Sequence, residues 1–110
     1  MKRLKLDGLT ECQTETLRAI FSLNQGSQAF KTVEEVARER VTMRGWGNRE
    51  TRRRGSYFGM YVSSTHKILE ELSRKGFVDQ SEKPARVESV ARPYKITKKG
   101  KQKVRKELHL

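Results

Sequence analysis

Cysteine is almost absent from this 110-residue chain, and so are long apolar runs. Cys12 is the only cysteine, so the chain cannot form a disulfide within itself, which is typical of a protein in a reducing compartment. No apolar run approaches the roughly 18 residues of a membrane-spanning helix. The opening residues, MKRLKLDGL, are basic but lack the uninterrupted apolar stretch of a secretion signal. We therefore expect a cytoplasmic protein that does not span a membrane.

Acidic residues are scarce: the chain has 13 of them against 25 lysines and arginines, which leaves a formal net charge of +12. Because a charge this high repels itself, it normally implies an anionic partner, most often nucleic acid and less often a membrane surface. Hydrophobic residues make up only 34% of the chain, which suffices for one modest core. The composition predicts a single thin-cored domain over residues 1–110 that binds a polyanion.

The positive charge is concentrated in two segments, residues 42–56 with a net charge of +4 and residues 95–110 with +6. Together they carry ten of the twelve excess positive charges, whereas the signs are interspersed in the rest of the chain. If the charge served only to keep a lysine-rich surface solvated, positive and negative residues should be interspersed along the whole chain. That pattern is found only outside these two segments. The first segment reads TMRGWGNRETRRRGS and contains Arg44, Arg49, Arg52, Arg53 and Arg54.

Two capping boxes predict the first two helices. Thr10 with Gln13 three residues later begins a helix that should end near the turn-forming sequence NQGSQ at residues 24–28. Thr32 with Glu35 begins a second, short helix of about ten residues with a charged outer face.

A third helix is predicted by apolar or small residues at helical spacing over residues 58–72. It should end at Gly76, which suits the left-handed cap after the last turn. Its start is open: the apolar pattern favours a start near Ser56, but Ser63 or Ser64 can also cap the helix.

After the third helix, two short strands are predicted at residues 77–81 and 92–97, joined by a polar connection. Thr97 then caps a basic terminal helix within residues 98–110, KKGKQKVRKEL, which is weakly held because its only apolar residues are Val104 and Leu108. The predicted fold class is α+β, mostly α.

Three of these segments, TVEEVARERV, VSSTHKILEELSRKGFV and RPYKITKKGKQ, resemble in their order the winged helix-turn-helix superfamily of MarR-like and PadR-like transcription regulators. The resemblance covers residues 10–108. It implies a three-helix core, a recognition helix at about residues 62–75, a two-stranded wing over residues 79–93 and a C-terminal helix. The matching positions are Val62, Ser63, Thr65, Leu69, Leu72, Gly76 and Val78, then Tyr94, Ile96, Thr97 and Gly100.

The chain departs from this family in the connection before the recognition helix, because residues 42–56 stand where family members usually have a tight turn. A loop of this length between packed helices is normally functional or disordered. An insertion directly before a recognition helix lies beside the DNA-binding face, where its arginines would meet phosphates or enter the minor groove. The alternative is a flexible, solvated loop with no contact role.

The resemblance implies a double-stranded DNA-binding protein, most simply a transcription regulator, whose recognition helix enters the major groove. On that helix Ser63, Ser64, His66 and Lys67 should lie on the outward side of the first turns. Two alternatives remain for them: the serines cap the helix, and His66 is a surface histidine without a role. Basic wing residues that could grip the minor groove or the backbone are Lys83, Arg86 and Arg92.

An RNA-binding or ribosome-associated winged helix is the main alternative, favoured by the arginine-rich segment. Trp46 within that segment either packs on the core or stacks on an unpaired base, and stacking would favour RNA or single strands. A replication-initiator-type winged helix and a protein-interaction module that binds acidic partners are further alternatives. A homodimer is open: the terminal helix is too charged to pair with itself, and MKRLKLDGL is the better candidate for a contact.

Catalytic and metal-binding motifs find little support. Ser63 and His66 lie three residues apart, but no carboxylate is placed to orient the histidine. Cys12, His66 and His109 lack the spacing of metal ligands. The glycines of the arginine-rich segment follow no strand, as a phosphate-cradling motif would require. We therefore expect a protein that is not an enzyme and that uses neither a metal nor a cofactor.

Overall fold

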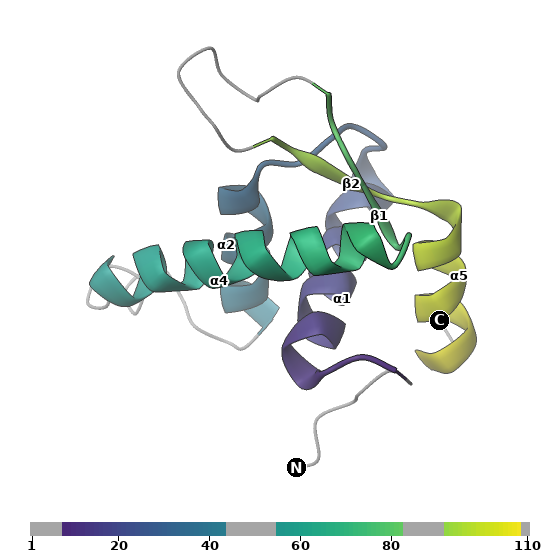
Figure 1. Cartoon of the computed structure of the whole chain (residues 1–110), viewed down its shortest axis with the longest axis horizontal. Coiled ribbons are helices and arrows are strands. Elements are labelled where there is room, and N and C mark those ends of the chain that lie inside the picture. The colour runs from purple at the N-terminus through teal and green to yellow at the C-terminus, as the bar shows by residue number, and fades with distance from the viewer. Residues whose placement is uncertain (1–7, 44–54, 83–91, 109–110) are drawn as a thin grey trace.

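The computed structural model describes residues 8–43, 55–82 and 92–108, and in this part of the chain it forms four helices and a two-stranded antiparallel sheet (Figure 1). An α-rich molecule with a small sheet agrees with the predicted α+β class. None of the described helices has both the length and the apolar character to cross a membrane. The elements are α1 (Glu11–Gly26), α2 (Val33–Met43), α4 (Gly55–Arg74), β1 (Val78–Gln80), β2 (Tyr94–Ile96) and α5 (Lys98–Leu108).

Both predicted capping boxes are present. At α1 the backbone N–H of Gln13 donates to Thr10 Oγ1 over 3.1 Å, and Gln13 Oε1 accepts from the backbone N–H of Thr10 over 3.0 Å. Thr32 and Glu35 make the same reciprocal pair at α2, each bond 3.1 Å long. These local bonds satisfy N–H groups that a helix start leaves without partners, which is why sequence spacing alone located both starts.

The first helix is the centre of the molecule. It lies behind α4 in Figure 1, with α5 beyond the C-terminal end of α4, and it packs against α2, α4, α5 and β2. Leu17 and Ile20 of α1, Leu69 and Leu72 of α4 and Val104 of α5 have no solvent-exposed surface. One hydrophobic cluster therefore connects the helices to the sheet.

The hairpin pairs Val78 with Ile96 and Gln80 with Tyr94, and the backbone N–H of Ser81 continues it by donating to the carbonyl of Pro93 over 2.9 Å. The strands are shorter than the predicted 77–81 and 92–97, and Pro93 precedes β2 instead of lying within it. The opposite edge of β2 is also used: Lys31 and Tyr94 exchange two backbone hydrogen bonds of 2.6 and 2.8 Å. The sequence contained no signal for this bridge.

Asn24 was predicted only as a turn former near the end of α1, but it is buried and connects α1 to the sheet. Its Oδ1 accepts from the backbone N–H of Ile96 over 2.9 Å, and its Nδ2 donates to the carbonyls of Ser27 and Ala29 over 2.8 and 3.0 Å. One side chain thus satisfies three backbone groups and shapes the turn after α1 while it holds β2 in place.

Two glycines allow close packing where the hairpin meets its flanking helices: Gly76 follows α4, and Gly100 is in the first turn of α5. Gly76 has φ +84° and forms the predicted left-handed cap, after which Phe77 N–H donates to Leu72 O over 3.0 Å. Thr97 caps α5 as predicted, because its Oγ1 accepts from the N–H of Gly100 over 3.0 Å, and it also donates to the carbonyl of Gly76 over 2.7 Å. A Cβ at Gly100 would collide with the carbonyl oxygen of Phe77.

Replacing Gly100 with alanine should therefore destabilise the fold, because backbone lies on both sides of the collision and cannot rotate away. We expect a loss of about 1–3 kcal/mol in the free energy of unfolding, the usual cost of overpacking. Gly59→Ala is the matched control: its Cβ would meet nothing within 4 Å, so alanine should stabilise α4 by up to about 1 kcal/mol. Urea denaturation followed by circular dichroism measures both, and equal stability of the two variants would contradict the close approach.

Candidate nucleic-acid interface

The N-terminal half of α4 presents an exposed surface that carries no acidic residue. Thr65, Ile68, Leu69 and Leu72 form the buried side of the helix. We call the side of the helix opposite to these residues, from Gly59 to Lys67, the α4 face. Its members are all exposed: Gly59, Met60, Ser63, Ser64 and Lys67.

Most side chains of the α4 face are small, so another molecule can approach the helix backbone closely. Gly59 has no neighbouring atom where a Cβ would stand, and Ser63 and Ser64 add only a hydroxymethyl group. The two larger members are Met60, 69% exposed, and Lys67. The side chain of Met60 is flexible and apolar and can adapt its shape to a surface that contacts it.

The serines do not lie where the sequence placed them along the helix. Because α4 begins at Gly55, eight helical residues precede Ser63, and at 3.6 residues per turn both serines fall in the third turn. Neither serine caps the helix, so the alternative of a start at Ser63 or Ser64 is wrong and the start near Ser56 is confirmed. The predicted outward orientation holds, but the helix N-terminus does not assist their contacts.

His66 lies at the edge of the α4 face. Its Nε2 is 3.3 Å from Glu70 Oε1 in an i,i+4 pair, and its side chain is 38% exposed. Glu70 is the first acidic residue in the sequence of α4, and its side chain is 43% exposed. His66 is therefore accessible, as predicted, but it is paired along its own helix.

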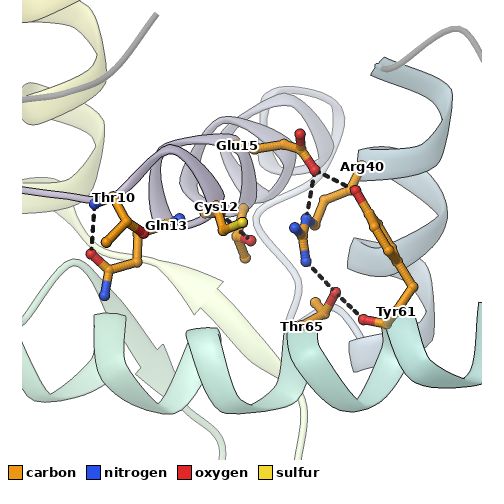
Figure 2. Close-up of polar contacts among 8 residues, drawn as sticks. Thr10, Cys12, Gln13, Glu15, Arg40, Tyr61 and Thr65 are labelled. Atoms are coloured by element: carbon orange, nitrogen blue, oxygen red, sulfur yellow. Dashed lines mark hydrogen bonds and ion pairs between the residues drawn. The ribbon is translucent and has the colours of Figure 1, made fainter. Parts of the chain in front are cut away.

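A buried polar network holds this half of α4 against α1 and α2 (Figure 2). Arg40 of α2 is only 1% exposed, and its Nε donates to Glu15 Oε1 of α1 over 2.9 Å. Its Nη1 donates to Thr65 Oγ1 of α4 over 2.7 Å. The guanidinium also stacks over the ring of Tyr61, 4.3 Å from its centroid, and the Tyr61 hydroxyl donates to Glu15 Oε1 over 2.5 Å.

This network fixes the helix that carries the α4 face. Thr65 Oγ1 accepts a hydrogen bond from Arg40 and donates one to the carbonyl of Tyr61 over 2.7 Å, so the hydroxyl acts as both acceptor and donor. A buried guanidinium is tolerated only when its charge is compensated and its donors are satisfied. Arg40 was not predicted to be buried, because the charged residues of α2 were assigned to its outer face. Its place four residues after Val36, on the inward side of α2, was an available signal.

Tyr94, the first residue of β2, lies within electrostatic reach of Glu70 in the C-terminal part of α4. Burial raises the pKa of the Tyr94 hydroxyl above its usual value, and the carboxylate of Glu70 on α4 raises it further. The hydrogen bond from Gln80 and the charge of Arg92 act in the opposite direction. Arg92 is exposed, as predicted for a wing residue. The other predicted wing residues, Lys83 and Arg86, lie outside the described residues.

The arginine-rich segment lies largely outside the described residues, including Arg44, Arg49, Arg52, Arg53, Arg54 and Trp46. Its two ends are described: Thr42 and Met43 belong to α2, and α4 begins at Gly55. The connection between α2 and α4 therefore comprises residues 44–54, which is shorter than the predicted 42–56. Arg52 to Arg54 come directly before the first residue of α4, so the chain itself places them next to the end of the helix that carries the α4 face.

The second basic segment does not join the α4 face. Lys99 Nζ of α5 donates to the carbonyl of Lys75 over 2.9 Å and stands 5.0 Å from the ring centroid of Phe77, beyond the C-terminal end of α4. Figure 1 shows α5 at the opposite end of α4 from Gly55. The described residues therefore place α5 away from the α4 face, whereas most of the arginine-rich segment lies outside the described residues.

No group of three or more His, Cys, Asp or Glu in the described parts of the chain could hold a metal ion. Two hollows among the described residues are lined by residues of α1 and α5, one of them also by Met43 of α2, and neither is lined by a residue of α4. No family model, curated protein or solved structure matches this chain.

Replacing Arg40 with methionine should destabilise the protein by about 3 kcal/mol, because it removes one partner of a buried ion pair together with the guanidinium hydrogen bonds to Thr65 and Glu15. Arg38→Met on the exposed side of α2 is the matched control, and its effect should remain within about 0.5 kcal/mol. Chemical denaturation measures both. Equal losses for the two arginines would show that the network does not hold the helices together.

Proposed function

We propose that this chain is a winged helix-turn-helix protein that binds double-stranded DNA and acts as a transcription regulator. The observation that carries the proposal is the α4 face, an exposed and acid-free surface on a rigidly held helix that directly follows three consecutive arginines. The order α1, α2, α4 and then an antiparallel hairpin suits this fold.

In the proposed complex the α4 face enters the major groove, which is about 12 Å wide and admits an α-helix. Gly59 and Ser63 allow the helix backbone to approach the base edges. Ser64 and Lys67 are the candidates for hydrogen bonds to bases, since a hydroxyl bonds donors or acceptors and a lysine favours the acceptors of guanine. Met60 supplies an apolar contact, for which the methyl group of thymine is the matching feature of the groove.

The flanking cations position the helix on the duplex. Arginines before Gly55 would neutralise phosphates beside the groove that α4 enters, and Arg92 at the start of β2 would bind the backbone on the hairpin side. Contacts to phosphates fix the register of a protein on DNA but carry little sequence information. Recognition by base contacts and attachment by phosphate contacts therefore fall to different residues, which mutagenesis can separate.

The first test is selection of bound sequences from a random duplex pool, with a structured RNA pool in parallel. We expect enrichment of a defined duplex motif and weaker, unselective binding of RNA. Enrichment of RNA alone would favour the RNA-binding alternative. Log affinity for the selected duplex should fall against log salt with a slope of about −5 to −7, because about six to eight cations would meet phosphates, and a slope near −1 would contradict the electrostatic account.

Replacing Arg52, Arg53 and Arg54 with alanine should weaken binding to all duplexes alike. If all three meet phosphates, the salt slope should become shallower by about 2 to 3, since each contact contributes about 0.9. Titrations of a selected and a scrambled duplex at several salt concentrations measure both effects. Unchanged affinity would remove these arginines from the interface.

Variants of the α4 face should instead change sequence preference. We expect Lys67→Ala combined with Ser64→Ala to reduce discrimination between the selected motif and its single-base variants by about 1–3 kcal/mol per lost base contact. Arg74→Ala, exposed in the last turn of the same helix, is the control and should leave the preference unchanged. Identical preference in all three proteins would place recognition elsewhere.

A further inference from the structure

The last helix has two rows of cations that the proposed contact with DNA does not use. Residues at i, i+3 and i+7 share one side of a helix, which places Lys98, Lys101 and Arg105 in a row that adjoins α1. The opposite row contains Lys99, Lys103 and Lys106. No acidic residue occurs between Lys98 and Lys106. The first row spans about 10 Å along the helix at 1.5 Å per residue, so it suits a line of charges better than a single anion.

The first row borders a cleft between α1 and α5 that is polar and cationic. Lys101 Nζ donates to Gln28 Oε1 over 2.8 Å, and the Arg105 guanidinium stands 5.8 Å from the ring centroid of Phe21. Gln25 lines the same cleft, and Arg18 lines the neighbouring depression on α1. None of the residues that line the two hollows is acidic, and the carboxylate of Glu39 adjoins the depression, where it accepts from Ser22 Oγ over 3.3 Å. We call this cleft and the two rows the α5 surface.

A duplex bound to the α4 face would not extend to the α5 surface. The α4 face ends at Lys67, seven residues or about 10 Å along the helix before Arg74, and α5 lies beyond that end. Glu70 and Glu71 interrupt the positive charge between the two surfaces. Arg18 also lies about 140° around α1 from Gln13, the residue that binds Glu71 of α4, so the depression at Arg18 opens away from α4.

We propose that the α5 surface binds the phosphate backbone of a second nucleic-acid segment, so that one molecule of this protein bridges two segments. The inference rests on the proposed function, which supplies the first segment. A membrane fits less well than nucleic acid, because Val104 is fully buried and none of the large exposed hydrophobic residues in the described chain, Phe30, Met43 and Met60, belongs to α5. An inserting helix needs an exposed apolar side.

Two short duplexes, one with a donor dye and one with an acceptor dye, test the proposal through energy transfer in the presence of the whole protein. Wild type should bring the duplexes together. Lys98→Gln with Arg105→Gln should reduce bridging about fivefold or more, while affinity for one duplex changes less than about twofold, because only phosphate contacts of the second segment are lost. Lys98→Glu is a second variant that keeps the stacking of Arg105 on Phe21.

The matched control is Lys31→Gln with Arg38→Gln, which removes the same charge from other parts of the surface and should retain bridging. An experiment with a single long tethered duplex at low protein concentration shows whether the two bridged segments belong to one DNA molecule or to two. If the protein shortens the tethered duplex and the α5 variants do not, two segments of one duplex are bridged. Energy transfer between the labelled short duplexes shows that separate duplexes are bridged. Either result supports the second surface.

Three results would overturn the proposal: α5 variants that bridge like wild type, a control that loses bridging equally, and a fall in single-duplex affinity that matches the loss of bridging. The last result would place α5 on the first duplex. Binding of anionic vesicles or an acidic peptide by the α5 surface, without bridging, would also exclude it. If wild type binds no duplex at all, the proposed function itself fails, whereas retained binding without bridging refutes only the second surface.

Discussion

The arrangement of the three main helices depends on one buried cation. The Arg40 guanidinium, on α2, bonds Glu15 of α1 and Thr65 of α4, and it stacks on Tyr61 one helical turn earlier in α4. A buried charge cannot lose its partner without a large penalty, because the remaining charge is then buried and uncompensated. The network therefore selects one register among those that the few apolar contacts of α1, α2 and α4 would tolerate, and the orientation of the α4 face follows from it.

Directional contacts play the same part elsewhere in this thin core. Asn24 connects the end of α1 to the backbone of Ile96, and Gly100 allows α5 to approach the carbonyl of Phe77. Thr97 both caps α5 and bonds the carbonyl of Gly76. In the described part of the chain, no buried side-chain polar atom lacks a hydrogen-bond partner. The buried apolar area of this core is small, and hydrogen bonds of fixed geometry supplement it. These bonds favour one packing arrangement where apolar burial alone would discriminate little between arrangements.

Local signals predicted local structure well, and contacts between distant residues explain what they missed. The two capping boxes, the cap at Gly76 and the short hairpin depend on residues close in sequence, and all are present. Arg40, in contrast, meets partners 25 residues away on either side, and Asn24 meets Ile96 72 residues away. For the candidate site, helical spacing predicted the outward orientation of Ser63, Ser64 and Lys67, but not the position of α5 relative to α4. That position arises from packing on α1 and from the contact of Lys99 with the carbonyl of Lys75, neither of which leaves a pattern in the sequence.

The distribution of charge follows from the same architecture. With a net charge of +12 on 110 residues, cations gathered in one place would repel each other and destabilise the folded state. The start of α4, which follows Arg52 to Arg54 in the sequence, and its other end, near α5, are about 30 Å apart, several times the screening length of about 8 Å at physiological salt. Each region can therefore remain strongly positive, and a polyanion that neutralises one leaves the attraction of the other unchanged.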